Sequence, residues 1–202
     1  EFSEETFSAK GATITIKGVQ IHPGYAFGKM VNPSTVAGDL LSKLPPAERP
    51  ETTKEREGYY CVTGMTADFE SATINMILRD FDDDKLNEMA KYLLQVVAKL
   101  NDKYGEGLVS VEIKDQYPNM KRFISQDPVV SEIALEAMKQ LGIEPKQKLT
   151  RGGTDGSKLS ARGLLTPNIF AGMENIHSRS EYVPVSTMVA AVGTIVEIVK
   201  GY

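Results

Sequence analysis

The chain has 202 residues, 41% hydrophobic and 25% charged, so it is long enough for one or two folded domains and is not disordered in composition. Its net charge of −4 argues against a nucleic-acid or anionic-membrane surface, since either needs clustered Lys and Arg. The sequence holds no run of 18 or more apolar residues, which argues against a membrane-spanning helix. We therefore expect no nucleic-acid partner and no membrane partner.

The single cysteine and the first residues bear on where the protein works. Cys61 cannot form an internal disulfide bond and fits a reducing compartment, so a cytoplasmic location is expected and Cys61 is interpreted as a small strand residue. Residues 1–5 contain no initiator Met and do not have the composition of a signal peptide. This beginning is typical of a piece of a longer protein.

The first part of the chain has a regular order of predicted elements. Over 8–18, alternation predicts a strand with Ala9, Ala12, Ile14 and Ile16 on one side. The elements that follow are a helix at 32–43, strands at 58–66 and 69–79, a helix at 83–102 and a strand at 107–115. The order β-α-β-β-α-β over 8–116 predicts a ferredoxin-like α+β sandwich, in which two helices cover one face of an antiparallel sheet.

After Tyr117-Pro118 the pattern changes to α/β. The predicted elements are a helix at 128–141, a short strand at 146–150, a glycine-rich turn at 151–156, a helix at 156–162, a strand at 167–171 and a helix at 184–200. Two short strands cannot build a shielded parallel sheet by themselves. This part is therefore predicted to be half of a domain whose other half lies outside the sequence.

The two histidines, His22 and His177, both lie in polar, turn-like segments. Loop histidines are more often solvated than functional, so the residue type alone does not decide their role. His177 follows the predicted strand at 167–171, and ligands of open α/β sheets collect just beyond strand ends. That position raises the chance that His177 is functional.

Two arginine-containing segments allow two interpretations each. Residues 151–156 read Arg-Gly-Gly-Thr-Asp-Gly, which fits an anion held by backbone amides and a guanidinium, or an ordinary turn with Asp155 capping a helix. Arg79 ends a strand, where it is either solvated or a fixed cationic donor in a cleft. The acidic run at 82–84 lacks the alternating spacing of a calcium loop and is interpreted as helix capping.

Five segments together resemble the peptidase T family of di-zinc M20 metallopeptidases, in the family's order and over nearly the whole chain. They are Ile21-His22-Pro23-Gly24, Ile77-Leu78-Arg79-Asp80-Phe81-Asp82, Tyr117-Pro118-Asn119-Met120, Arg151-Gly152-Gly153-Thr154-Asp155-Gly156 and Asn175-Ile176-His177. The resemblance implies a zinc-peptidase α/β catalytic domain interrupted by a lid or dimerisation domain of ferredoxin-like order. Residues 1–116 would form the lid, and 117–202 the C-terminal segment of the catalytic domain.

The resemblance also implies roles for individual residues. His177 matches a zinc ligand, and His22 matches a lid histidine that polarises the scissile carbonyl, across the dimer interface in related enzymes. Four residues would bind the substrate: Arg79, Asn119, Arg151 and Gly153, of which Arg151 with its glycine turn matches the site for the peptide's terminal carboxylate. The family's remaining zinc ligands and its general base have no match, and Glu4-Glu5 is not that acidic pair.

The function implied is a cytoplasmic, homodimeric aminopeptidase that removes the N-terminal residue from tripeptides with two zinc ions. This chain would supply the substrate clamp and one zinc ligand, so it is expected to be inactive alone. Two alternatives remain open. One is a non-catalytic dimerisation module, and the other is a related M20 dipeptidase or aminoacylase.

Overall fold

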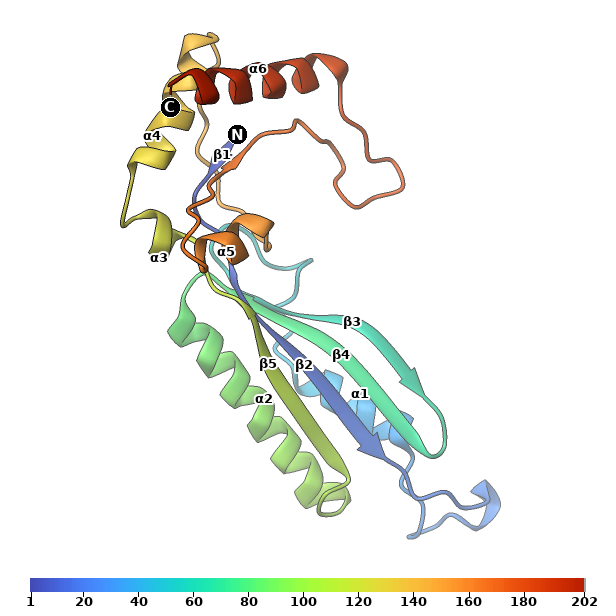
Figure 1. Cartoon of the computed structure of the whole chain (residues 1–202). Coiled ribbons are helices and arrows are strands. Elements are labelled where there is room, and N and C mark those ends of the chain that lie inside the picture. The colour runs from blue at the N-terminus through green and yellow to red at the C-terminus, as the bar shows by residue number, and fades with distance from the viewer. Residues whose placement is uncertain (202) are drawn as a thin grey trace. The chain divides into compact units, whose positions relative to one another are not determined.

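The chain folds into two compact units, each with its own core. The computed structural model describes residues 1–201 (Figure 1). We call Phe7–Tyr117 the sandwich unit, and Glu1–Thr6 with the chain from Pro118 onward the terminal unit. The sequence prediction had counted residues 1–6 with the first domain. They belong to the terminal unit because Phe2 is fully buried beside Ala134 and Met138, which lie far along the chain.

The sandwich unit contains one four-stranded antiparallel sheet. Its elements are β2 (Ser8–Lys17), the short helix η1 (Pro23–Tyr25), α1 (Pro33–Lys43), β3 (Tyr59–Ala67), β4 (Ser71–Asp80), α2 (Asp83–Tyr104) and β5 (Val109–Tyr117). The strand order is β3-β4-β2-β5, with β2 and β4 in the centre (Figure 1). This arrangement confirms the predicted ferredoxin-like sandwich.

The core of the sandwich unit lies between one face of this sheet and the helices α1 and α2. The side chains that β4 contributes are those predicted from alternation: Ala72, Ile74, Met76 and Leu78. On β2 the prediction for Ala9 was wrong. Ala9 is buried but does not join this core, because in a regular strand it points to the face opposite Ile14.

Side-chain caps fix where both helices begin. The side chain of Asn32 accepts a hydrogen bond from the backbone N–H of Ser34 at the start of α1. At the start of α2, Asp82 Oδ1 accepts hydrogen bonds from the N–H groups of Asp84 and Lys85. The predicted capping role of the acidic run is therefore confirmed, and its negative charge also suits the helix dipole.

In the residues described, the terminal unit combines four helices with two two-residue strands and long irregular segments. Its elements are β1 (Phe2–Ser3), α3 (Lys121–Ile124), α4 (Val129–Gln140), α5 (Asp155–Ser160), β6 (Asn168–Ile169) and α6 (Val185–Gly201). β1 and β6 pair antiparallel. The strand predicted at 146–150 was wrong, because this segment makes only the isolated bridges Phe2↔Gln147 and Thr6↔Thr150.

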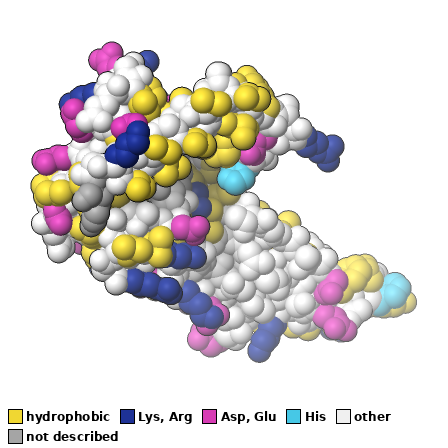
Figure 2. Space-filling model, turned by 45° about the horizontal axis from the view of Figure 1, so that its top comes forward, with side chains coloured by type: hydrophobic (Ala, Val, Ile, Leu, Met, Phe, Trp, Pro, Cys, Tyr) yellow, Lys and Arg dark blue, Asp and Glu magenta, His cyan; other side chains and the backbone are white. Residues whose placement is uncertain are grey.

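One face of α6 is apolar and exposed within the terminal unit. α6 packs against α4 on its other side. The exposed side chains are Val185, Met188, Val189, Val192, Ile195, Val196 and Val199, between 45% and 74% exposed. Figure 2 shows hydrophobic side chains gathered along this helix. No helix in residues 1–201 is both long and apolar enough to cross a membrane.

Two adjacent leucines of α2 provide a test of the core of the sandwich unit. Leu93 is fully buried in the core, whereas Leu94 is 50% exposed. We expect Leu93→Ala to lower the free energy of unfolding by about 2–5 kcal/mol, because it removes buried methyl groups and leaves a cavity. Leu94→Ala should change it by no more than about 0.5 kcal/mol. Urea denaturation of both variants measures the difference, and equal effects would contradict the assignment of faces.

Candidate functional site

Arg79 lies near the end of β4 on the sheet face that the helices do not cover. Its Nη1–H donates a hydrogen bond of 2.9 Å to Tyr59 Oη, and Tyr59 stands opposite Arg79 on the neighbouring strand β3. The guanidinium carbon is 6.0 Å from the centre of the Tyr59 ring. Arg79 Nε is buried and has no hydrogen-bond partner within residues 1–201. Tyr59 thus holds one nitrogen of the guanidinium, and the Nε–H group remains available to donate a hydrogen bond.

The aromatic residues beside Arg79 form a rigid support. Phe7 is fully buried, and its ring contacts the rings of Tyr59 and Phe81, with centroid distances of 5.5 and 4.2 Å. The Arg56 guanidinium stacks over the outer part of this cluster, 4.9 Å from the centre of the Phe81 ring. Packed aromatic rings have little rotamer freedom, so they fix the Tyr59 hydroxyl that orients Arg79.

His22 is exposed in the loop between β2 and α1, where it caps η1. Its Nδ1 accepts a hydrogen bond of 3.1 Å from the backbone N–H of Gly24. The imidazole lies 5.3 Å from the Tyr25 ring, measured between centroids. Because Nδ1 is an acceptor, the ring proton of the neutral side chain is on Nε2, which is available as a donor.

Asn119 is buried in the terminal unit, and its amide group is used by that unit. Asn119 Oδ1 accepts hydrogen bonds from the N–H groups of Thr6 and Lys121, and Nδ2 donates to Glu5 Oε1. Glu5 also receives the ammonium group of Lys121 at 3.1 Å. These contacts tie residues 1–6 to the start of α3, which is a structural role that the sequence did not predict for Asn119.

The glycine-rich turn leads into α5, but its cap differs from the predicted one. Thr154, rather than Asp155, is the N-cap residue, and Asp155 is the first residue of the helix. Thr154 Oγ1 is buried and has no hydrogen-bond partner among the described residues. Gly156 permits a close approach, because a Cβ atom there would lie 2.4 Å from the carbonyl oxygen of Thr166. Arg151 is half-buried and Gly153 is exposed.

His177 lies at an exposed turn closed by the bridge between Glu174 and Tyr182. Its φ angle is +65°, and its backbone N–H donates to Glu181 Oε2 at 2.6 Å. A non-glycine residue in this left-handed region carries backbone strain and often marks a functional turn. His177 itself is exposed.

A cavity in the terminal unit connects the two predicted motifs. Its volume is about 820 Å³, and both Thr150 and Thr154 line it on the side of the glycine-rich turn. Asn175 and Ile176, which precede His177, line it as well. Residues of both motifs thus line one cavity. Metal ligands do not gather there, because no group of three or more His, Cys, Asp or Glu in residues 1–201 can hold a metal ion. A zinc centre needs about three or four protein ligands, so these residues do not form one.

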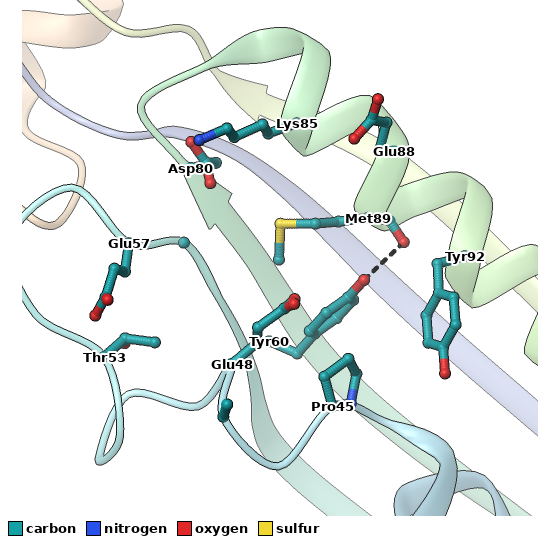
Figure 3. Close-up of a pocket in the computed structure, with 12 residues that line it drawn as sticks. Pro45, Glu48, Thr53, Glu57, Tyr60, Asp80, Lys85, Glu88, Met89 and Tyr92 are labelled. Atoms are coloured by element: carbon teal, nitrogen blue, oxygen red, sulfur yellow. Dashed lines mark hydrogen bonds between the residues drawn. The ribbon is translucent and has the colours of Figure 1, made fainter.

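A second cavity, which the sequence analysis missed, lies in the sandwich unit between α2 and the loop that follows α1 (Figure 3). Its volume is about 640 Å³, and four carboxylates line it: Glu48, Glu57, Asp80 and Glu88. Tyr60 crosses it and donates a hydrogen bond of 3.1 Å to the Met89 carbonyl oxygen (Figure 3). No local motif marks this cavity, because its residues come together only through the tertiary fold.

Two of these carboxyl groups are perturbed by burial. Burial raises the pKa of Asp80, although the backbone N–H of Asp82, which donates to Oδ1 at 2.8 Å, acts in the opposite direction. Burial also raises the pKa of Glu48, and the charge of Asp80 adds to this effect. Both groups therefore bind protons more tightly in the folded chain than in the unfolded chain.

This shift predicts a pH dependence of stability. Well below the ordinary pKa of 4.5, Glu48 is protonated in both states, and its contribution to folding is retained. That contribution is lost as pH rises through the higher pKa of the folded state. We expect Glu48→Gln to gain thermal stability relative to the parent between pH 4 and pH 7. Glu88→Gln, an exposed change at the same cavity, is the control, and an equal gain there would contradict the prediction.

Comparison with known proteins places both units in one family. The family profile described as the peptidase dimerisation domain of the M20 group matches residues 5–107. A peptidase T from Geobacillus thermodenitrificans is 47% identical over 200 residues, which are 99% of this chain and 49% of that relative. One from a Geobacillus species (strain WCH70) is 44% identical over 200 residues, again 99% of this chain and 49% of the relative. The chain thus spans about half the length of the curated relatives it matches.

Solved structures show the same fold. The crystal structure of an aminopeptidase PepT from Bacillus cereus covers 98% of this chain and 52% of its own, with a TM-score of 0.76 at 23% identity. A tripeptidase from Staphylococcus aureus has a TM-score of 0.80 at 19% identity over the same shares of both chains. At these identities the structures support the fold alone, and the family is given by the profile that matches residues 5–107. The chain belongs to the M20 peptidase family, and its sandwich unit carries the family's dimerisation domain.

Proposed function

We propose that this chain is part of a cytoplasmic, zinc-dependent aminopeptidase that removes the N-terminal residue from tripeptides. The observation that carries the proposal is the identity of 44–47% with peptidase T along 99% of the chain. The exposed His22 imidazole and the oriented Arg79 guanidinium support it, because both are donors suited to a peptide's carbonyl and carboxylate oxygens.

In this proposal the sandwich unit acts on the substrate as a lid. Arg79, fixed by Tyr59, binds an anionic oxygen of the peptide. His22 Nε2–H donates to the scissile carbonyl and stabilises the charge that develops there, because Nδ1 is already occupied by Gly24. His22 lies on an exposed loop, from which it can enter the active site of a second protomer.

The terminal unit contributes the second part of the site. Residues 117–202 form the C-terminal segment of the catalytic domain, with Arg151 and Gly153 binding the terminal carboxylate and Asn119 shaping the site through its buried network. His177 supplies one ligand to zinc, and the other ligands come from outside this chain. When bound, zinc supplies an activated water.

The exposed face of α6 supports the view that more polypeptide completes the terminal unit. Its seven exposed apolar residues include Val185, Val189 and Val199, each at least 67% exposed. A continuous apolar stripe of this kind is typical of a surface that is covered in the complete protein. Relatives twice as long as this chain have the length required to cover it.

The sheet edges indicate how two copies would pair. The edge strand β3 exposes Val62 and Met65 and carries no charged side chain, whereas the opposite edge strand β5 exposes Glu112, Lys114 and Asp115. Charged side chains protect an edge from pairing, and uncharged apolar ones favour it. We propose a homodimer through the sandwich unit in which β3 pairs between copies.

Two other functions compete with this proposal. A non-catalytic dimerisation module needs only the sandwich unit, and it is favoured by the lack of a metal-binding group in residues 1–201. A related M20 dipeptidase or aminoacylase would use the same clamp on a shorter substrate. Substrate assays distinguish both alternatives from the tripeptidase, because the module hydrolyses no peptide and the related enzyme acts on the shorter substrate.

The activity is tested by complementation. We expect no tripeptide hydrolysis by the chain alone with zinc, and hydrolysis once the complementary half of a peptidase T relative is added. In that complex His22→Ala should lower kcat by about 100- to 1,000-fold, since it removes one donor to the developing oxyanion. Phe27→Ala, a fully exposed change in the same loop, is the control. Turnover by the chain alone would refute the division of the site, and preference for dipeptides would favour the second alternative.

The dimer is tested at the β3 edge. We expect the parent chain to be dimeric by light scattering and Met65→Lys to shift it toward monomer, because a charge on an unpaired edge opposes strand pairing. Leu94→Lys places the same charge on an equally exposed site of α2, and it should leave the dimer intact. Dissociation by both variants, or by neither, would contradict pairing through β3.

A further inference from the structure

A β-bulge near the end of β5 changes the direction of Tyr117. In β5 the residues Val109, Val111 and Ile113 stand opposite core residues of β2, so alternation alone would keep Tyr117 on the helix-covered face. The register shifts between Lys10, which pairs with Asp115, and Ala9, which pairs with Tyr117. Gln116 is the extra residue. This insertion reverses the alternation and turns Tyr117 to the face opposite the helices.

The bulge places Tyr117 in one row with Arg79. Across the sheet Tyr59 pairs with Arg79, Arg79 with Ala9, and Ala9 with Tyr117. Directly paired residues share a face, so all four side chains project to the same side. Arg79 and Tyr117 are two strand spacings apart, about 10 Å between backbones, and only the small Ala9 stands between them. Their long side chains therefore lean over Ala9, which is 2% exposed.

Both side chains carry a buried donor group that makes no hydrogen bond of ordinary geometry. Arg79 Nε and Tyr117 Oη are buried, and neither has a partner within that geometry in the part of the chain that the structure describes. The Arg79 charge and a looser side-chain contact from the Arg79 guanidinium both act to lower the pKa of Tyr117, so the two groups face each other and the Tyr117 O–H is left to donate. Burial, the larger effect, raises this pKa, and the phenol therefore stays protonated at neutral pH as a donor. Buried unsatisfied donors are rare in folded proteins and point to a ligand.

We propose that Tyr117 is a substrate-binding residue whose O–H, together with Arg79 Nε–H, donates to the carboxylate of an acidic side chain of the peptide substrate, since the terminal carboxylate is assigned to Arg151 and Gly153. A carboxylate has two oxygens, so it can accept both hydrogen bonds, and the guanidinium makes the interaction charge-assisted. Tyr59 is the positioning residue, because its bond to Nη1 leaves Nε as the free donor. The claim that the carboxylate belongs to a peptide rests on the proposed function. The claim that an anion binds at this site does not.

The test is a titration of the isotope-labelled chain with acetate at constant ionic strength. We expect saturable shifts of the Arg79 Nε–H resonance and of the Tyr117 ring carbon that bears the hydroxyl. In Tyr117→Phe the Kd for acetate should rise about tenfold, which corresponds to about 1.4 kcal/mol. Tyr92→Phe is the matched control, because the Tyr92 hydroxyl donates to the Lys43 carbonyl, which belongs to α1 on the helix side of the sheet.

Two results would overturn the proposal: a Tyr117 resonance in the parent chain that does not respond to acetate, or an unchanged Kd in Tyr117→Phe. The resonance is read in the parent, so it decides the question even if the variant folds poorly. The complemented peptidase separates this inference from the proposed function. If it hydrolyses tripeptides that carry an acidic side chain with unchanged kcat/KM in Tyr117→Phe, only the role of Tyr117 fails. If acetate binds as expected but tripeptides are not hydrolysed, the anion site stands and the peptidase proposal fails.

Discussion

The pairing of β2 with both β4 and β5 is the constraint on which the sandwich unit depends. β2 pairs with two neighbours along almost its whole length, so its register fixes the positions of three strands at once. A slip by one residue would exchange the two faces and bring Ile14 out of the core. The same register brings Arg79 opposite Ala9, so the hydrophobic pattern that forms the core also sets the position of the cation.

The β-bulge near the end of β5 changes this register at one point, and the change turns Tyr117 to the face of Arg79. It lies at the end of β5, where the core no longer requires an apolar side chain, so an inserted residue disturbs little packing. Gly11 accommodates the insertion, because a Cβ atom there would lie 2.8 Å from the side-chain nitrogen of Gln116. One inserted residue at the sheet end thus converts a core position into a position on the functional face, which is a common use of bulges beside binding sites.

Sequence periodicity predicted the sandwich well, because its helices and strands are long and each has one buried face. The helices at Pro33–Lys43 and Asp83–Tyr104 end within two residues of the predicted bounds. Two of the misses depend on partners distant in the sequence: the pairing of Phe2 with Ile169 and the lost strand at 146–150 are decided by which segment lies alongside. The face of Ala9 is different, because regular alternation from Ile14 already places it on the opposite face. The sequence likewise did not predict that Arg79 and Tyr117 lie in one cross-strand row, since no local pattern indicates a register shift.

The two units differ in what they need from the rest of the protein. The sandwich unit buries a continuous core between its sheet and two helices, so the row from Tyr59 to Tyr117 is held by contacts within that unit alone. The terminal unit has a smaller core, an exposed apolar helix face and no metal-binding group in the residues described. The substrate contact that we propose for Arg79 would therefore be a local property of one folded unit, whereas the proposed zinc chemistry would need ligands from further polypeptide. In that proposal the sandwich unit keeps its substrate clamp in place although residues 1–201 hold no metal-binding group.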